Sequence, residues 1–504
     1  MSEPNSYRQV LRASSIIGGA QGLNYIVGLV RVKIVAILLG PSGVGLISLY
    51  QSILGLVGNI AGLGIGSSGV REVAEAHRNE EPVKAAKTVR VLRRACWLTG
   101  LLGWVLAAAL AKPISEWMFG TPEHALAIEV LGATLLMGSI SGGQMALLQG
   151  IRRIGDLARA NFTYMLITTL VTIGLYAWLG KKGIVPVMLT NAAVILVVCW
   201  SFARRVKIGP AILTWGETID GTRDLVGLGI AFMWSGLLAT GLDMATRFVI
   251  TREYGVSATG YYQAAWALSG MFAGFILTAM DADFYPRLTG AIHDRMLASR
   301  MVNEQTEIGV LLALPGLLTT LAFGPFVIQI FYTAHFLAGA ALLPWFLVGV
   351  FGQVVSWPLA FIQPAKGAGR WFIATETISV AFRSGLVIWL VPRFGPVGAA
   401  YAFASGYVAH TVGMRWVGSR LIGFRWSRGV KRLLFLSGLA VATGTAVRLW
   451  LPGWQAMAIG GVIAFAGSLA SLRGLALRLG NDHVLIRACG RVPGVNRLLH
   501  FRSV

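Results

Sequence analysis

Charged side chains are scarce in this chain: Asp, Glu, Lys and Arg together make up 13% of its 504 residues. Soluble domains carry about 25% charged residues, roughly twice as many. Hydrophobic residues, by contrast, account for 55% of the sequence. The composition therefore excludes an ordinary soluble protein and indicates an integral membrane protein.

Cysteine is rare as well, with three residues scattered at positions 96, 199 and 489. Their positions lack the spacing of metal ligands or of a disulfide framework. The sequence also lacks the G-x-x-x-x-G-K-[ST] motif, which excludes an ATP motor carried by the chain itself. No long extramembrane loop carries a cluster of acids and histidines. We therefore expect no metal, no cofactor and no catalytic residues.

Acidic residues are only half as frequent as basic ones, 21 against 43, and the formal net charge is +22. Such a charge could indicate either a nucleic-acid-binding protein or the charge bias of a membrane protein. The positions of the Lys and Arg residues distinguish these two interpretations. With a cytoplasmic N-terminus and an even number of spans, most Lys and Arg residues fall in cytoplasmic loops, as the positive-inside rule requires. The excess of basic residues therefore reflects mainly the orientation of the helices in the membrane, and contact with anionic membrane lipids is a smaller contribution. We expect no nucleic-acid partner.

Long apolar runs predict an all-α polytopic membrane protein of about fourteen transmembrane helices, each near the ~20 residues that cross the hydrocarbon. The first run is too long for a cleavable signal peptide and lacks a small-residue cleavage site. Both termini are expected in the cytoplasm. The predicted spans are 11–39, 43–67, 91–111, 124–150, 157–179, 184–203, 224–251, 256–281, 303–324, 336–363, 371–391, 396–414, 432–451 and 454–472.

A repeated pattern of glycines indicates an internal duplication. The segment 40–45 joins the first two spans, and 255–260, which lies 215 residues later, joins the seventh and eighth. We therefore predict two pseudo-symmetric six-helix bundles at 1–215 and 216–430, an extra helix pair at 431–472 and a basic cytoplasmic tail at 473–504. Because six is even, both bundles enter from the same side and are related by an axis along the membrane normal.

Four cations lie within the apolar runs, where a charge costs roughly 2.5–3.5 kcal/mol on insertion scales. Such residues usually face a cavity or a partner, and the planar fork of arginine suits a phosphate. Asn24 lies on the helix face of Arg31 and would extend a polar stripe. The competing interpretations are structural pairing for the arginines and snorkelling for Lys33. The candidate substrate-binding residues are Arg31, Arg247, Arg383, Lys33 and Asn24.

Four acids are candidates for ion coupling or gating. Asp243 lies one turn before Arg247 and is either its counter-ion or a protonatable coupling group. Glu376 lies seven residues before Arg383 and offers the same choice between coupling and a salt bridge. Asp281 and Asp283 end the eighth predicted span, where they would form an inside gate or simply solvate a helix end.

Short stretches of the chain, taken in order, resemble the O-antigen and enterobacterial common antigen flippases. This Wzx-type family belongs to the multidrug/oligosaccharidyl-lipid/polysaccharide exporter superfamily, and the likeness covers most of residues 8–415. The stretches are LGPSGVGL at 39–46, AGLGI at 61–65 with AE at 74–75, PISE at 113–116 with FG at 119–120, YPRL at 285–288, AK at 365–366 with Arg370 and Glu376, and GPVGAA at 395–400.

The resemblance implies a flippase in a bacterial inner membrane that moves an undecaprenyl-diphosphate-linked oligosaccharide, such as an O-antigen or exopolysaccharide repeat unit, from the cytoplasmic to the periplasmic leaflet by alternating access. A polysaccharide polymerase and a chain-length regulator are candidate protein partners. The two extra apolar runs at 432–472 depart from a twelve-helix plan, and related lipid II flippases have fourteen helices.

Three other functions compete. A lipid II flippase shares the fourteen-helix plan, and an ion-coupled multidrug exporter shares the fold. An exporter of cationic drugs needs a site lined by carboxylates, whereas the intramembrane residues here are mainly cations. A membrane glycosyltransferase or polymerase needs a catalytic base in a large loop, which this chain lacks.

Overall fold

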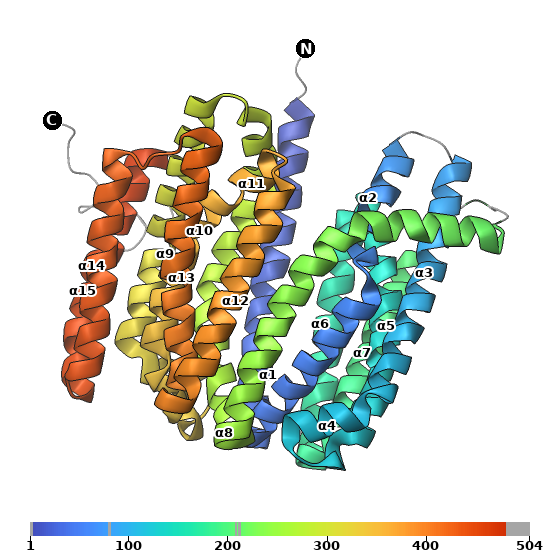
Figure 1. The fold of residues 1–504 in the computed structure, drawn as a ribbon, viewed down its shortest axis with the longest axis horizontal. Coiled ribbons are helices and arrows are strands. Elements are labelled where there is room, and N and C mark those ends of the chain that lie inside the picture. Colours follow the sequence, from blue (N-terminus) through green and yellow to red (C-terminus); the bar gives the residue numbers. More distant parts are fainter. Residues whose placement is uncertain (1–3, 79–81, 207–208, 210–212, 480–504) are drawn as a thin grey trace. The chain divides into compact units, whose positions relative to one another are not determined.

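The computed structural model describes residues 4–78, 82–206, 209 and 213–479, which form helices joined by short turns, with no strand in these ranges. Figure 1 shows the helices in chain order. Their bounds are α1 Pro4–Gly62, α2 Ile65–Arg78, α3 Pro82–Ala109, α4 Ala111–Phe119, α5 Ala125–Gly150, α6 Ile154–Leu179, α7 Ile184–Ala203, α8 Trp215–Ala291, α9 Arg295–Phe331, α10 Leu343–Ala360, α11 Ile362–Ala365, α12 Gly369–Phe394, α13 Val397–Ile422, α14 Arg428–Trp450 and α15 Gly453–Leu479, with short 3-10 helices at Pro122–His124, Gly180–Gly183 and Ala334–Ala341.

The predicted spans each correspond to helix. Nine helical segments within the described ranges are long and apolar enough to cross a membrane, and the one at Gly155–Ala203 contains both α6 and α7. The predicted run 336–363 is divided into a 3-10 turn, α10 and α11, with Pro344 in the first turn of α10. Helix α15 continues seven residues past the predicted end at 472. The rest of the predicted basic tail, from 480 on, lies outside the described residues.

The first two predicted spans join into the single long helix α1, which is broken at Gly40, and the seventh and eighth join into α8, which is broken at Gly255. Gly40 has φ 65° and ψ −172°, and Gly255 has φ 80° and ψ 172°. A positive φ of this kind is accessible to glycine without a steric penalty. The two glycines chosen from the sequence as equivalent therefore have the same backbone conformation, although the duplication itself stays a prediction.

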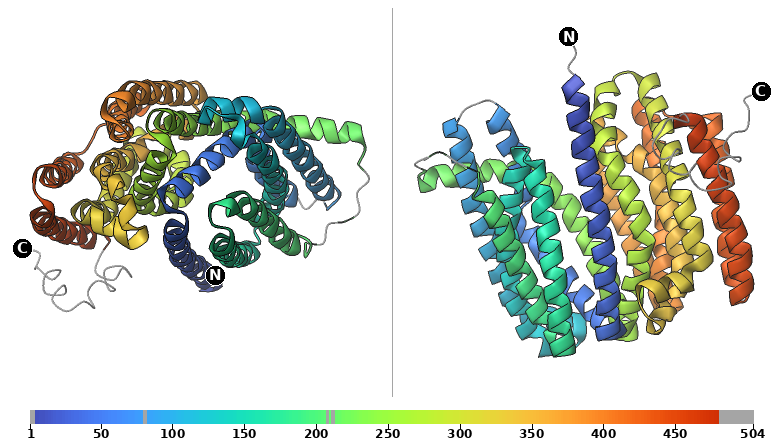
Figure 2. Two further views of the ribbon diagram at one scale, coloured as in Figure 1. Left: turned by 90° about the horizontal axis from the view of Figure 1, so that it is seen from below. Right: turned by 180° about the vertical axis from the view of Figure 1, so that it is seen from behind.

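The chain divides into two compact units, Met1–Gly260 with Phe331–Thr333, and Tyr261–Ile330 with Ala334–Val504. In the first unit α3 packs on α5, α5 on α7, α7 on α6 and α6 on α1, and the views of Figure 2 show these helices side by side. Small residues allow the close approach, since Gly132 lies against Trp104 and Gly143 against Cys96. Such contacts replace a hydrophobic driving force between helices in lipid.

In the second unit α13 packs on both α10 and α12, and α14 packs on α15 and α10. Gly349 and Gly352 of α10 lie one turn apart and contact Phe403 and Tyr407 of α13. Helix α14 begins at a serine cap, where the Ser427 hydroxyl accepts a hydrogen bond from the Val430 amide at 3.2 Å. The two extra apolar runs are thus an ordinary helical pair within this unit.

The first turn of α8 is held by a capping box, in which a Thr side chain and a Glu side chain each bond the other's backbone amide. The Thr214 hydroxyl accepts from the Glu217 amide at 3.2 Å, and the Glu217 carboxylate accepts from the Thr214 amide at 2.9 Å. Lys87 of α3 pairs with the same carboxylate at 2.7 Å. These bonds hold the pKa of Glu217 at about 2, with the Lys87 hydrogen bond as the largest cause.

Candidate functional site

Arg31 lies on α1, at a half-buried position on the helix that packs against α6. Its guanidinium interacts electrostatically with the phenol groups of Tyr176 and Tyr164, both on α6. Within the described residues no carboxylate pairs with it. Arg31 is therefore an intramembrane cation whose described electrostatic partners are phenol groups, which carry no neutralising charge when they are protonated.

Lys33, two residues further along α1, has a different environment. Its ammonium donates a hydrogen bond to the backbone carbonyl of Tyr332, which follows the end of α9. Two residues turn an α-helix by about 200°, which explains why Arg31 and Lys33 contact different segments. The contact joins these two segments of the first unit, and the binding role of Lys33 stays a prediction.

Arg247 on α8 is buried, with 6% of its surface exposed. It forms an ion pair with the carboxylate of Asp243 one turn earlier, and its Nη1 also donates to the Asp243 carbonyl at 3.3 Å. The next residue, Phe248, stacks on Trp117 of α4 with ring centroids 3.9 Å apart. The sequence left open whether Asp243 neutralises Arg247, and the structure shows that the pair forms.

Arg383 on α12 belongs to a polar cluster with Glu376 on the same helix and Tyr407 and His410 on α13. The guanidinium carbon lies 5.2 Å from the centre of the Tyr407 ring, a cation–π distance, and Nε donates to the Ser379 carbonyl at 3.4 Å. No ion pair joins Glu376 to Arg383 in the part of the chain that the structure describes. The imidazole Nδ1 of His410 is buried, and no hydrogen-bond partner for it lies among the described residues. This α12–α13 cluster thus holds a cation, an acid and a histidine in an apolar unit.

Three predicted site residues lie outside the described side chains, namely Asn24, Asp281 and Asp283. The backbone at 281 and 283 is helical and continues to Ala291, so these two acids do not end a helix. The structure brings Arg247 and Asp243 together, and it brings Glu376 and Arg383 into one cluster. Arg31 and Lys33 contact different segments.

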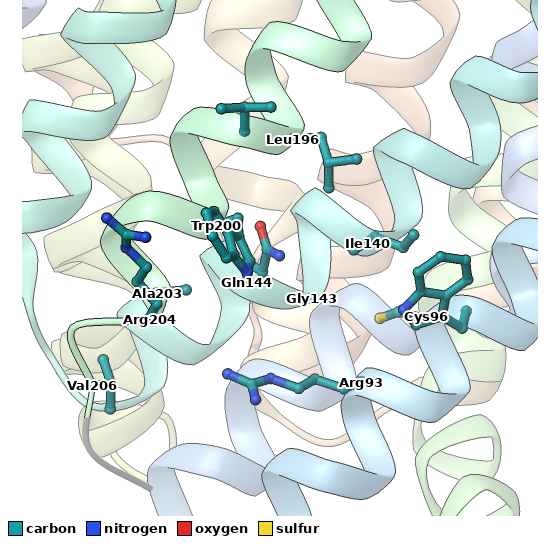
Figure 3. A pocket seen from close by; sticks show the side chains of 12 residues that line it. Arg93, Cys96, Ile140, Gly143, Gln144, Leu196, Trp200, Ala203, Arg204 and Val206 are labelled. Atoms are coloured by element: carbon teal, nitrogen blue, oxygen red, sulfur yellow. The ribbon is translucent and has the colours of Figure 1, made fainter.

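The first unit also contains a cavity of about 690 Å³ that the sequence did not predict. Figure 3 shows its wall, formed by side chains of α3, α5 and α7. Gln144 is 9% exposed, and its Oε1 is buried with no hydrogen-bond partner in the described ranges. In the sequence, the Trp and Arg residues that line this cavity look like ordinary interfacial residues. Only the packing of three helices shows that they line one cavity. The lining residues are Arg93, Cys96, Trp97, Ile140, Gly143, Gln144, Leu196, Val197, Trp200, Ala203, Arg204 and Val206.

The fold matches solved transporters over nearly the whole chain. A structure of the lipid II flippase MurJ, in an inward closed conformation, aligns with a TM-score of 0.68 at 14% identity and covers 92% of this chain and 100% of that one. An inward-facing MATE-family multidrug resistance transporter of the MOP superfamily aligns with a TM-score of 0.64 at 15% identity, covering 81% and 96%. The chain is therefore a multi-pass helical membrane protein with the MurJ and MATE transporter fold.

A family model described as "Polysaccharide biosynthesis protein" matches residues 34–341, more than half of the chain. The chain belongs to this family. The lipid III flippase of Escherichia coli (strain K12) is 25% identical over 394 residues, which cover 76% of this chain and 92% of the relative. The lipid III flippase of Shigella flexneri matches with the same values. The resemblance predicted from short stretches is thereby confirmed at the level of a polysaccharide biosynthesis family.

Proposed function

We propose that this chain is a flippase that moves an undecaprenyl-diphosphate-linked oligosaccharide from the cytoplasmic to the periplasmic leaflet of a bacterial inner membrane. The cargo would be the repeat unit of a surface polysaccharide, either O-antigen or exopolysaccharide. Membership of the polysaccharide biosynthesis family supports this proposal, as does the similarity to the lipid III flippases. Flipping forms and breaks no bond, so the protein needs binding groups rather than catalytic ones.

The observation that carries the proposal is Arg31, a cation on a membrane-spanning helix whose described neighbours are the phenols of Tyr164 and Tyr176. A cation at this depth is costly unless a water-filled cavity or an anion compensates it. A diphosphate carries the opposite charge, and a guanidinium binds phosphate oxygens through two parallel hydrogen bonds. Tyrosine hydroxyls beside it would donate to the phosphate or to sugar hydroxyls.

Arg247 and Arg383 would have secondary roles. Arg247 already has Asp243 as counter-ion, so it offers less net charge to a diphosphate than Arg31 does. Arg383 lies at a cation–π distance from Tyr407 and forms no ion pair within the described residues, so it would attract an anion. Glu376, in the same cluster, is the candidate for ion coupling. Moving one charge across the membrane is worth about 2.3 kcal/mol per 100 mV, and coupling to an ion would supply this free energy to the transport cycle.

Alternating access is the proposed mode of movement. Solved MATE-family transporters of the same fold include inward-facing and outward-facing conformations. A chain of this fold can thus expose a binding site to one leaflet and then to the other. The lipid tail would stay in the hydrocarbon while the glycan crosses in water. A polysaccharide polymerase and a chain-length regulator would act on the product.

A lipid II flippase is the second candidate. The structural likeness to MurJ covers 92% of this chain, whereas the likeness to the inward-facing MATE transporter covers 81%. A multidrug exporter on the MATE fold is less well supported, because a cationic drug would be repelled by Arg31 and Arg383. The substrates of these three functions differ in their head groups, which makes them separable by experiment.

Flipping in proteoliposomes tests the proposal directly. The wild-type protein should translocate a fluorescent polyprenyl-diphosphate oligosaccharide, and Arg31→Ala should abolish the signal while the protein still inserts. Arg448→Ala, which removes a cation from α14, is the matched control and should leave flipping unchanged. Transport of lipid II in preference to the oligosaccharide would favour the second candidate. Full activity of Arg31→Ala would overturn the site.

A further inference from the structure

The cavity between α3, α5 and α7 shares no residue with the candidate transport site. Gln144 is one of its lining residues, and the amide oxygen of Gln144 has no hydrogen-bond partner within the described part of the chain. A buried polar atom without a partner costs about 1–3 kcal/mol, so such a group normally faces a ligand or water. In Figure 3 this amide points into the space between the three helices. Gln144 therefore places an unsatisfied hydrogen-bond acceptor at the cavity wall.

Two arginines give the cavity a positive charge. Arg93 of α3 reaches across the opening below Gln144 (Figure 3), and within the described residues it makes no hydrogen bond or ion pair. Arg204, just past the end of α7, stacks on Trp200, with its guanidinium carbon 4.8 Å from the ring centre. No carboxylate is among the lining residues. The polar group that enters must therefore be an anion.

The remaining wall is apolar. Leu196 and Val197 of α7 and Ile140 of α5 line one part of it, and the indole rings of Trp97 and Trp200 line another. Tryptophan prefers the depth of lipid head groups, where one edge of the ring is wet and the other is apolar. A ligand that fits this wall must carry a hydrocarbon chain beside its anionic group.

The cavity lies at the end of the bundle where the basic residues gather. Helix α7 ends at Ala203, and α5 ends six residues after Gln144, about 9 Å along the axis. Arg152 and Arg205 follow these helix ends and are exposed. By the positive-inside rule this is the cytoplasmic face. Basic pockets between membrane helices on that face are typical sites for anionic lipid head groups.

We propose that this cavity binds one anionic glycerophospholipid of the cytoplasmic leaflet. Its phosphate would contact Arg93 and Arg204, a head-group hydroxyl would donate to the Gln144 amide oxygen, and an acyl chain would lie along Leu196 and Val197. A hydroxyl fits this oxygen because it carries a proton to donate, which an ionised phosphate oxygen lacks. A cavity of about 690 Å³ is large enough for a head group and the first part of the chains. The proposal does not depend on the transported substrate.

Native mass spectrometry of the full-length protein in detergent tests the site, with phosphatidylglycerol as the probe. The variant R93Q/R204Q should retain phosphatidylglycerol about tenfold less than wild type, since each arginine near an anionic head group contributes roughly a several-fold factor. The variant R152Q/R205Q removes two charges from the same face without touching the cavity lining. It should bind as wild type does.

Further measurements separate the sources of the phosphate group. Gln144→Leu should lower retention of phosphatidylglycerol more than retention of phosphatidic acid, which has no head-group hydroxyl beyond its phosphate. Equal loss of binding in R93Q/R204Q and R152Q/R205Q would overturn the proposal, because it would show only a general surface charge. Retention of undecaprenyl phosphate in place of phosphatidylglycerol, or thermal stabilisation by inorganic phosphate alone, would also overturn it.

Discussion

Gly45 and Gly260 pack against each other's segments in a reciprocal way. A side chain on Gly45 would collide with the carbonyl oxygen of Val256, and a side chain on Gly260 would collide with that of Pro41. Positions 41 and 256 are equivalent in the predicted duplication, and so are 45 and 260. A contact that repeats itself with the partners exchanged is what a two-fold axis between the segments produces. The duplication, which stays a prediction, would account for this exchange of partners.

Gly45→Ala and Gly260→Ala should each destabilise the protein, because the added methyl group meets a backbone carbonyl that cannot rotate away. Overpacking of this kind costs about 1–3 kcal/mol. Each variant should lower the thermal midpoint of the purified protein. Gly142→Ala on α5 is the control, since no atom lies within 4 Å of its new methyl group. Equal midpoints for all three variants would contradict the tight contact.

Asp243→Asn should destabilise the protein by leaving the buried Arg247 guanidinium without its counter-ion. Breaking a fully buried pair costs about 3–5 kcal/mol, and since the Asp243 side chain is 35% exposed the cost should be nearer 2 kcal/mol. The double variant Asp243→Asn/Arg247→Met should regain much of this loss. Chemical denaturation of the four proteins gives the coupling energy. A double variant as unstable as the sum of the singles would show that the pair is unimportant.

Glu376→Gln tests whether the α12–α13 cluster couples flipping to ions. If Glu376 carries the proton, the variant should flip substrate at the same rate with and without a pH gradient, whereas the wild-type protein should be faster with one. Flux in proteoliposomes with an imposed gradient measures this. Glu304→Gln, which alters an exposed glutamate paired with Arg300 on α9, is the matched control. Continued response of Glu376→Gln to the gradient would remove the assignment.

Glu217 should make the anchoring of α8 sensitive to acid. Its folded-state pKa, about 2, lies below the ordinary value of 4.5 because of bonds to Lys87 and then to Thr214. A depressed carboxyl pKa stabilises the folded state above pH 4.5, and this stabilisation is lost as the pH falls towards 2. The thermal midpoint of Glu217→Gln should thus lie below that of the wild type at neutral pH. The gap should narrow as the pH falls from 4.5 to 2, and a constant gap would contradict the lowered pKa.

Much of the helical plan was predictable, because an apolar run of about twenty residues has one stable arrangement in a bilayer. The span at 184–203 coincides with α7, and the glycines at 40 and 255 marked both breaks. The division of the predicted span 336–363 was not predicted, and the prolines of this stretch do not mark it, since Pro344 and Pro358 both lie within α10. Proline is tolerated in the first turn of a helix, so its presence does not locate a break.

The site was less predictable than the fold. Sequence spacing offered the Arg247–Asp243 pair as one of two interpretations of Asp243, because residues four apart on a helix are neighbours. It could not foretell that Arg31 would meet Tyr164 and Tyr176, which lie on α6. The same limit applies to Tyr407, which contacts Arg383 from α13. Contacts between helices depend on how each helix is rotated about its axis, which no single stretch of sequence states.

The chain's residues by themselves determined that it lies in a membrane, which stretches are apolar helices and where charges enter the hydrocarbon. These properties follow from the transfer of individual side chains between water and lipid, which is local to each segment. Only the tertiary structure determined which of the intramembrane cations form ion pairs and where the cavity between α3, α5 and α7 lies. The Gln144 amide oxygen has no partner among the described residues, and it shares a cavity with Arg93 because close packing at small residues such as Gly143 sets α5 against α3. That packing depends on the shapes of side chains far apart in the sequence.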